Sequence, residues 1–475
     1  MTTPRASAIP SADAVGQVLL LVPVVCSALL VSLLPPITWK VQLTMAAAAA
    51  QVAGFYILAR TGALRRSPLD APALAFLAVA VAATLLSVDR QVSFYPSPLR
   101  GDGLLVYIAY VLAGLGAARL SFHQRKVLLW GMLGSGSVVA LVALGQYYGT
   151  DQLQWIGFHL VPPQVEFAEG TSMFVFEPVG PGGRSLGTLG QSMFLGALTV
   201  LLLPVAVAST VTSSRRGTNL FSAASAVLLY GGLVASQSRT AWIAAVASGA
   251  FLVVLLPKAR IVWARLAALV VVLAAVTVVM SATRPQTGLA RRAVSVVDEV
   301  QHADRSLGQR LYIWTQTLQL LRQRPALGWG FSALLGRFPG YGTPEYRRRF
   351  GEEVVELIDN PHNEFLSVAF STGLVGLTAY LWVWAAAVSG AIRGWRGRRE
   401  AGNLSGAVLA ALLAYFIWMQ TAWSHIGVAN MLWVILGVAA ASPAGSDIPG
   451  APPSDSRYNV QCCGGVQGTR LSGRS

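Results

Sequence analysis

The chain has 475 residues, of which 54% are hydrophobic and only 12% are charged. A soluble protein carries about twice that charged fraction. The composition therefore excludes a soluble enzyme, a disordered chain and a disulfide-rich secreted scaffold. Apolar runs of about 20 residues also exclude an outer-membrane barrel, whose strands alternate in polarity. The sequence predicts an all-α, polytopic membrane protein.

The chain has a formal net charge of +15, with 35 Lys and Arg against 20 Asp and Glu. In a soluble protein this excess would suggest nucleic acid as a partner. Here most of it lies in short connections between apolar segments, where it sets membrane topology. We therefore expect membrane lipids, and no nucleic acid, as partners.

The hydropathy pattern predicts a single integral-membrane domain over residues 1–442, with twelve spans. The expected spans are about 17–39, 41–59, 71–88, 103–120, 127–148, 192–212, 219–236, 240–257, 261–281, 364–389, 403–420 and 428–442. Only the four residues Ser236, Gln237, Ser238 and Arg239 connect the seventh and eighth spans, which predicts a tight helical hairpin. The tail, 443–475, is rich in Pro, Gly and Ser and is expected to be disordered and cytoplasmic. No role is assigned to its Cys462 and Cys463.

Orientation follows from the basic residues of the short loops, which favour the cytoplasmic side. One set of loops holds 15 of them: Arg60, Arg65, Arg66, Arg119, Arg125, Lys126, Arg215, Arg216, Lys258, Arg260, Arg265, Arg393, Arg396, Arg398 and Arg399. The alternate set holds 5: Lys40, Arg90, Arg100, Arg184 and Arg239. This bias predicts a cytoplasmic-membrane protein with both termini in the cytoplasm.

Two expected outer loops are long, at about 149–191 and 282–363. The second has 82 residues and carries 11 Arg and no Lys. A structureless loop of that size is unusual, so we expect local helices. Residues 306–322 place Leu307, Leu311, Trp314, Leu318 and Leu321 on one helical face. Pro325 and the LGWG stretch end that helix, which is expected at the membrane surface.

Three residues of the outer side are candidates for chemistry. Arg239 stands at the end of a span, where an arginine faces a cavity or an anion, or else snorkels as an anchor. His362, in DNPHNEFL, is a candidate base, although this segment is also a typical polar helix start. Arg310, on the expected amphipathic helix, is suited to bidentate contact with phosphate. Arg347–Arg349 fit a solvated run better than a site.

The sequence offers little for metals or cofactors. Five His are scattered, and neither a DxD pair nor a phosphate-binding loop occurs. We therefore expect no metal and no cofactor.

Three patches resemble the O-antigen ligase and polymerase superfamily of bacterial membrane glycosyltransferases. They are RSLGTLGQSMFLGALTVLLLP (184–204), SQSRTAWIA (236–244), and a third patch that runs from 308–334 to DNPHNEFLSVAFSTGLVGL (359–377). The last is the most specific, because it joins a P-x-x-G-x-G turn to an HNxxL helix start. The family often has Asn where this chain has Ser192. The resemblance covers about 180–390.

The resemblance implies one helical membrane domain whose large outer loop, about 282–363, caps a catalytic cavity. It implies transfer of a glycan from an undecaprenyl-diphosphate carrier to a lipid, glycan or protein acceptor, without metal and with inversion. The family's hairpin arginine falls on Arg239, the arginine of its RxxxW pattern on Arg310, and its histidine on His362; these three are the expected catalytic residues. The residues expected to bind the diphosphate or glycan are Arg184, Arg239, Arg310, Trp314 and Asn363.

The residue types agree with that reaction. Arginines stabilise the charge that gathers on a leaving diphosphate, and a neutral His accepts the proton of the acceptor hydroxyl. An O-antigen ligase-like enzyme is the first interpretation. An O-antigen-type polymerase and a protein O-oligosaccharyltransferase share this chemistry and remain open. A twelve-helix secondary transporter is a second alternative, although matching broken spans are absent. A flippase or scaffold of a glycan pathway is the third.

Overall fold

The computed structural model describes residues 11–34, 37–96, 101–150, 164–166, 172–174, 184–285, 306–340, 343–350, 358–397 and 399–441. This part of the chain is helical, as expected, apart from one short strand pair. The strands β1 (Gln164–Glu166) and β2 (Ser172–Phe174) pair antiparallel within the first long loop. The sequence did not predict them. The tail beyond 441 lies outside the described residues.

Seven described helices are long and apolar enough to cross a membrane, which makes the chain a multi-pass membrane protein. They are α1 (Ala12–Leu30), α2 (Ile37–Arg60), α6 (Phe122–Tyr147), α8 (Ser192–Thr212), α9 (Arg216–Ser236), α11 (Arg260–Thr283) and α15 (Glu364–Trp395). Shorter apolar helices cover the other five predicted spans: α3 (Asp70–Leu85), α5 (Leu104–Ala117), α10 (Arg239–Leu255), α16 (Arg399–Trp418) and α17 (Ile426–Ala440). A count of twelve membrane crossings stays a prediction.

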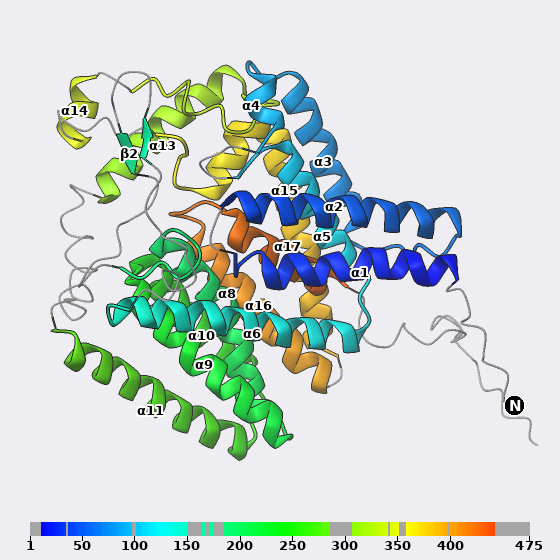
Figure 1. Ribbon diagram of the computed structural model, residues 1–475, viewed down its shortest axis with the longest axis vertical. Helices are drawn as coiled ribbons and strands as arrows, with labels where there is room; N and C mark the ends of the chain where they lie inside the picture. Colours follow the sequence, from blue (N-terminus) through cyan, green and yellow to red (C-terminus); the bar gives the residue numbers. More distant parts are fainter. Residues whose placement is uncertain are drawn as a thin grey trace, which may run out of the picture.

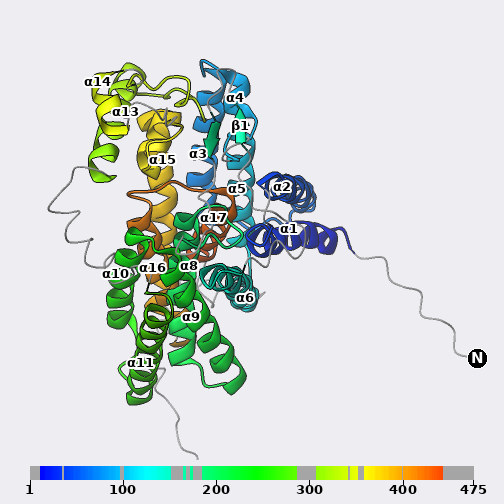
Figure 2. The same ribbon diagram turned by 60° about the vertical axis from the view of Figure 1, so that its left-hand side comes forward.

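Two helices form the centre of the bundle. Every residue of α17 is buried, and α8 is buried along almost its whole length. Around them, α1 and α2 form a pair at one edge, and α11 lies at the periphery against α8 and α9 (Figure 1 and Figure 2). The exposed surface of α11 is apolar, as with Val271 and Val278. A helix that is apolar both on its exposed face and on the face packed against the protein is expected to contact lipid.

The turn between α9 and α10 is as short as predicted, but the two helices do not form a packed hairpin. Gln237 takes a left-handed conformation with φ 50°, and Ser238 precedes the first residue of α10. From there α10 packs mainly against α16 and α8. Gly196 of α8 makes this approach possible, because a Cβ there would lie 2.8 Å from the Cβ of Ala241.

The second long loop contains two helices, as expected. α13 (Ser306–Gln323) ends before Pro325, and α14 (Pro344–Phe350) follows. The predicted leucine face of α13 is divided: Leu321 is buried, whereas Leu311 and Leu318 are exposed. The helix packs on the protein through Tyr312 and Ile313, among others, with α15 as a neighbour.

The P-x-x-G-x-G turn lies against a break in α15. Gly373 has φ 69° and ψ −176° inside that helix, so the backbone groups around it are free to bond elsewhere. Trp329 and Gly330 donate from their amides to the carbonyls of Phe370 and Ser371, at 2.9 Å each. A Cβ on Gly373 would lie 2.0 Å from the Ala326 carbonyl oxygen. The turn and the helix break thus fit each other and fix the loop on the bundle.

Candidate active site

The predicted site residues lie at one end of the bundle, which we call the outer end. It carries the turn before Arg239, the segment 184–191, helix α13, the segment 358–363 and the connection 419–425 between α16 and α17. Among the described residues, the three non-glycine residues with positive φ are Gln237, Ser332 and His362, of which Gln237 and His362 belong to these segments. Such conformations cost about 1–3 kcal/mol each and concentrate where a site dictates the backbone.

Two of the predicted arginines, Arg184 and Arg239, act electrostatically on the third, Arg310. Burial lowers the pKa of Arg310, and the positive charges of Arg184 and Arg239 lower it further. Arg184 precedes α8, Arg239 begins α10 and Arg310 lies on α13, so three separate segments bring their guanidinium groups within electrostatic range. The lowered pKa shows that the charge of Arg310 is costly where it stands. A bound anion would remove that cost.

Two hydrogen bonds hold the Arg184 and Arg239 segments in place. The amide of Ser185 donates to the carbonyl of Ala235 near the end of α9, at 3.1 Å. The Thr240 hydroxyl lies 2.8 Å from that of Thr421 in the connection between α16 and α17. The first bond attaches the segment of Arg184 to the end of α9. The second attaches the start of α10, which Arg239 begins, to the connection that follows α16.

His362 stands just before α15, in the left-handed region with φ 51°. Its amide donates to the Asn360 side chain at 2.8 Å, which closes the turn. Its ring meets the ring of Trp423 edge to face, with centroids 4.7 Å apart. The preceding carbonyl, that of Pro361, accepts a 2.8 Å hydrogen bond from the indole of Trp314 on α13. His362 is therefore held between α13 and the connection 419–425.

The two residues after His362 anchor that connection. Asn363 caps α15, because its Oδ1 accepts from the Leu366 amide, and its Nδ2 donates to the Gln420 carbonyl at 2.9 Å. These contacts hold the protein itself together, and a role of Asn363 in substrate binding stays a prediction. Glu364 is 3% exposed, and its carboxylate accepts from the Ser424 amide at 2.7 Å.

These interactions connect the segments at the outer end of the bundle to one another. Arg310 interacts with Arg184 and Arg239, Thr240 beside Arg239 contacts Thr421, and Trp423 contacts His362. Trp314, one turn from Arg310 on α13, then bonds to Pro361 beside His362. Four of the six predicted site residues, Arg184, Arg239, Arg310 and His362, thus come from four separate segments that these interactions connect.

The sequence reasoning missed the connection 419–425, MQTAWSH. It contributes Trp423, which packs on Phe194 as well as on His362. It also contributes His425, whose ring stacks on Phe194 at 4.2 Å. A polar and aromatic turn without Lys or Arg between two apolar runs was the available signal.

Metal ligands do not gather within the described ranges, where no group of three or more His, Cys, Asp or Glu side chains is close enough to hold an ion. Cationic side chains dominate the network instead, together with one imidazole and several indole and hydroxyl groups. Such an arrangement is suited to an anionic substrate.

Residues 224–381 match the family model described as O-antigen ligase. The match runs from the second half of α9 through α10, α11, α13 and α14 to the first half of α15, and so includes Arg239, Arg310 and His362. No curated protein matches the chain. Through residues 224–381, which are about a third of its length, the chain is similar to the O-antigen ligase family.

Proposed function

We propose that the chain transfers a glycan from undecaprenyl diphosphate to an acceptor at the outer face of the cytoplasmic membrane, as an O-antigen ligase-like enzyme. The donor, the acceptor and the roles of the residues are all part of this proposal. The observation that carries it is the convergence of Arg184, Arg239 and Arg310 on one electrostatic environment, with His362 in the same contact network.

The three arginines are proposed to bind the diphosphate. Burial of Arg310 and the positive charges of Arg184 and Arg239 near it make the charge of Arg310 unfavourable without an anion. A diphosphate carries several negative charges and gains more as the glycosyl bond breaks. Fixed guanidinium groups stabilise that gain without rearrangement.

His362 is proposed to be the general base. The acceptor oxygen forms a bond to the anomeric carbon, and the bond from that carbon to the diphosphate oxygen breaks. Undecaprenyl diphosphate leaves with the bonding electrons, and the acceptor proton passes to the imidazole of His362. An in-line displacement of this kind inverts the anomeric centre. Trp423 and Trp314 orient the base through its ring and its neighbouring carbonyl.

The acceptor separates three versions of the proposal. An O-antigen ligase uses a lipid core, a polymerase uses a second lipid-linked repeat, and an oligosaccharyltransferase uses a protein. The site described here is compatible with each of them, because it concerns the donor diphosphate. The ligase version is the one that the matching family's description names.

The experiment uses the purified full chain in proteoliposomes with a radiolabelled glycan on undecaprenyl diphosphate. Lipid A-core, a lipid-linked repeat and an acceptor protein are supplied separately. The proposal expects labelled glycan on one of these acceptors and one undecaprenyl diphosphate released per glycan transferred. Entry of intact label into the vesicles, with the diphosphate bond unbroken, would indicate a transporter or flippase instead.

A further inference from the structure

A polar cavity lies at the opposite end of the bundle from Arg239. It has a volume of about 450 Å³ and opens between the first turns of α6, the end of α8, the start of α9 and the first turns of α16. Ligand pockets of proteins are typically about 300–1,000 Å³ in volume. This cavity is therefore large enough for a small polar head group.

The lining of this cavity is cationic and rich in hydroxyl groups. Lys126 and Arg215 supply two positive charges, and none of the described residues that line it is acidic. The hydroxyls come from Ser209, Thr212 and Thr218, among others. The Lys126 ammonium lies 5.6 Å from the ring centre of Trp130, so an indole also borders the cavity. Positive charge with hydroxyl donors is the chemistry that binds phosphate.

The position of the cavity relative to a bilayer follows from α8. This helix begins at Ser192, beside the candidate active site, and ends at Thr212, which lines the cavity. At 1.5 Å per residue its 21 residues span about 30 Å, the thickness of the hydrocarbon core. With the active site at one membrane surface, the cavity lies at the other. That surface is the cytoplasmic one in the topology that the loop charges predict.

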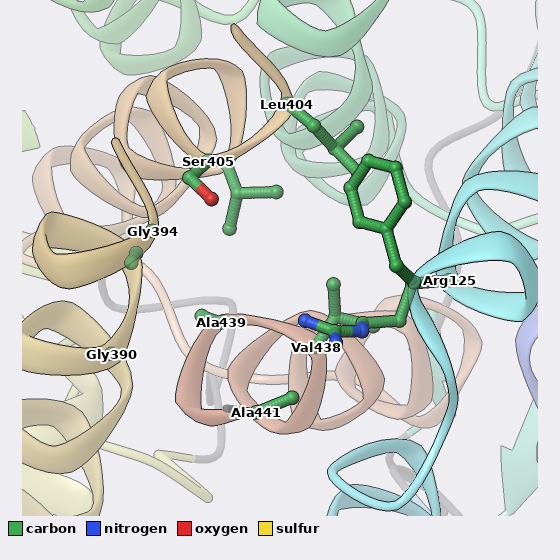
Figure 3. A pocket seen from close by; sticks show the side chains of 11 residues that line it. Arg125, Gly390, Gly394, Leu404, Ser405, Val438, Ala439 and Ala441 are labelled. Carbon is green, nitrogen blue, oxygen red and sulfur yellow. The ribbon is translucent and has the colours of Figure 1, made fainter. Parts of the chain in front are cut away.

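A neighbouring cavity is too small to hold a head group. Figure 3 shows the Arg125 side chain directed into a space between α6, α15, α16 and α17, where Ser405 is the other polar side chain of the lining. Its volume is about 20 Å³, enough for about one water molecule. Phe122 and Leu404 line both cavities and separate them. A head group therefore fits beside Lys126 and does not fit beside Arg125.

We propose that the cavity around Lys126 and Arg215 binds the phosphate of an anionic phospholipid head group in the cytoplasmic leaflet. That leaflet is the one rich in anionic lipid, and basic pockets between spans bind such head groups. The two cations contact the phosphate, the hydroxyls of α8 and α9 donate to its oxygens, and Trp130 lies at the depth of the head groups, as indoles do. The site is independent of the glycan-transfer proposal.

The test measures lipid retention by native mass spectrometry of the full chain released from nanodiscs. Nanodiscs contain either phosphatidylglycerol or phosphatidylethanolamine at matched chain length. Wild-type protein is expected to retain phosphatidylglycerol selectively. The double variant Lys126→Gln, Arg215→Gln is expected to bind it about 30-fold more weakly, about fivefold for each charge removed. Equal retention of the two lipids by wild-type protein would overturn the proposal.

Two further variants separate local from general effects. Arg65→Gln, Arg66→Gln removes the same charge from exposed residues of another predicted cytoplasmic loop, away from the cavity lining, and is expected to keep selective retention. Ser214→Trp fills the cavity from an exposed position without changing charge and is expected to weaken retention. Retention that depends equally on Lys126 with Arg215 and on Arg65 with Arg66 would overturn the proposal. So would retention that Ser214→Trp leaves unchanged.

A competition arm distinguishes a lipid from a soluble phosphate. Inorganic phosphate and glycerol phosphate are added at millimolar concentration to protein that holds phosphatidylglycerol. The proposal expects the lipid to stay bound, because its acyl chains lie against the apolar surface of the bundle. Displacement by either soluble phosphate at that concentration would contradict the lipid assignment.

Discussion

The indole nitrogen of Trp314 lies 2.8 Å from the carbonyl oxygen of Pro361 and donates a hydrogen bond to it. This bond joins α13, which carries Arg310, to the residue directly before His362. In the proposed reaction Arg310 would act on the leaving diphosphate and His362 on the acceptor hydroxyl. Their relative position therefore depends on a contact that touches neither group directly.

Removal of this hydrogen bond alone is expected to reduce glycan transfer. Trp314→Phe keeps an aromatic ring in place but leaves the Pro361 carbonyl without this donor. A hydrogen bond of this kind contributes about 1 kcal/mol, which predicts a loss of about fivefold in kcat. Initial rates over a range of acceptor concentrations check this. A loss confined to KM would mean that Trp314 contacts the acceptor rather than positions His362.

Substitution of the arginines is expected to lower the transfer rate far more than Trp314→Phe does. Arg310→Ala or Arg239→Ala should lower the transfer rate about 100- to 1,000-fold, because each removes a fixed charge from the leaving diphosphate. Arg310→Lys should recover only part of the rate, since a lysine lacks the bidentate geometry. Arg322→Ala provides the control, because Arg322 is exposed on the same helix. Similar losses in the Arg310 and Arg322 variants would indicate damage to α13 rather than to a site.

His362 allows a substitution that preserves the backbone. Asparagine tolerates the left-handed conformation that His362 adopts, so His362→Asn should fold normally. It cannot accept the acceptor proton, and transfer should fall about 100-fold or more. Thermal unfolding in detergent confirms the fold, and the transfer assay measures the loss. Transfer at the wild-type rate would remove the proposed base.

Glu364 is expected to support glycan transfer indirectly, by holding the connection 419–425 in place. Its buried carboxylate accepts from the Ser424 amide, next to Trp423, which packs on His362. Glu364→Ala leaves that amide without its acceptor, which costs about 1–3 kcal/mol in stability. Glu364→Gln retains an acceptor oxygen and should recover most of the stability and of kcat. Equal loss of kcat in both variants would show that the charge itself, and not the position of Trp423, matters.

The pH dependence of stability is expected to include His425. Burial and the charge of Lys40 lower the pKa of His425 to about 3 from the ordinary value of 6.5. Its neutral Nδ1 accepts from the Gly427 amide at the start of α17. Between pH 6.5 and 3 the unfolded chain holds one more proton here than the folded chain. Stability is therefore complete above pH 6.5 and declines by about 1.4 kcal/mol per pH unit below it.

His425→Asn isolates this contribution. Asparagine is a good helix cap and does not titrate. The difference in melting temperature between wild type and variant, measured in detergent from pH 7.5 to pH 5, should change in favour of the variant as the pH falls. A difference that is constant with pH would contradict the assignment to His425.

Helix positions follow from hydropathy because an apolar run in a membrane has no other stable backbone. Each of the twelve predicted spans overlaps a described helix, and α13 occupies 306–323 where 306–322 was expected. The end of the first span was wrong, because α1 ends at Leu30 and α2 begins at Ile37, whereas the span was expected to run to about 39. The break at Gly373 could not be predicted, since a single glycine within an apolar run is also compatible with a continuous helix. It depends on the turn at Gly328 and Gly330, which lies more than 40 residues earlier in the sequence.

The candidate site was predictable only in part. Arg239, Arg310 and His362 were identified from their motifs, but a motif does not give the contacts between segments. The position of α10 against α8 and α16 depends on the small size of Gly196. The role of Trp423 depends on the fold, because the connection 419–425 carries no charged side chain to draw attention. Long-range packing, rather than local pattern, completes the site.

The central claim is that Arg239 and Arg310 bind the same diphosphate, and a double-mutant cycle on donor binding tests it most directly. The dissociation constant of undecaprenyl-diphosphate glycan is measured for wild type, Arg239→Gln, Arg310→Gln and the double variant. Two groups on one ligand are expected to couple by about 0.5–3 kcal/mol, so the double variant should lose less affinity than the two single losses combined. Strictly additive losses, or unchanged affinity in either single variant, would contradict a shared site.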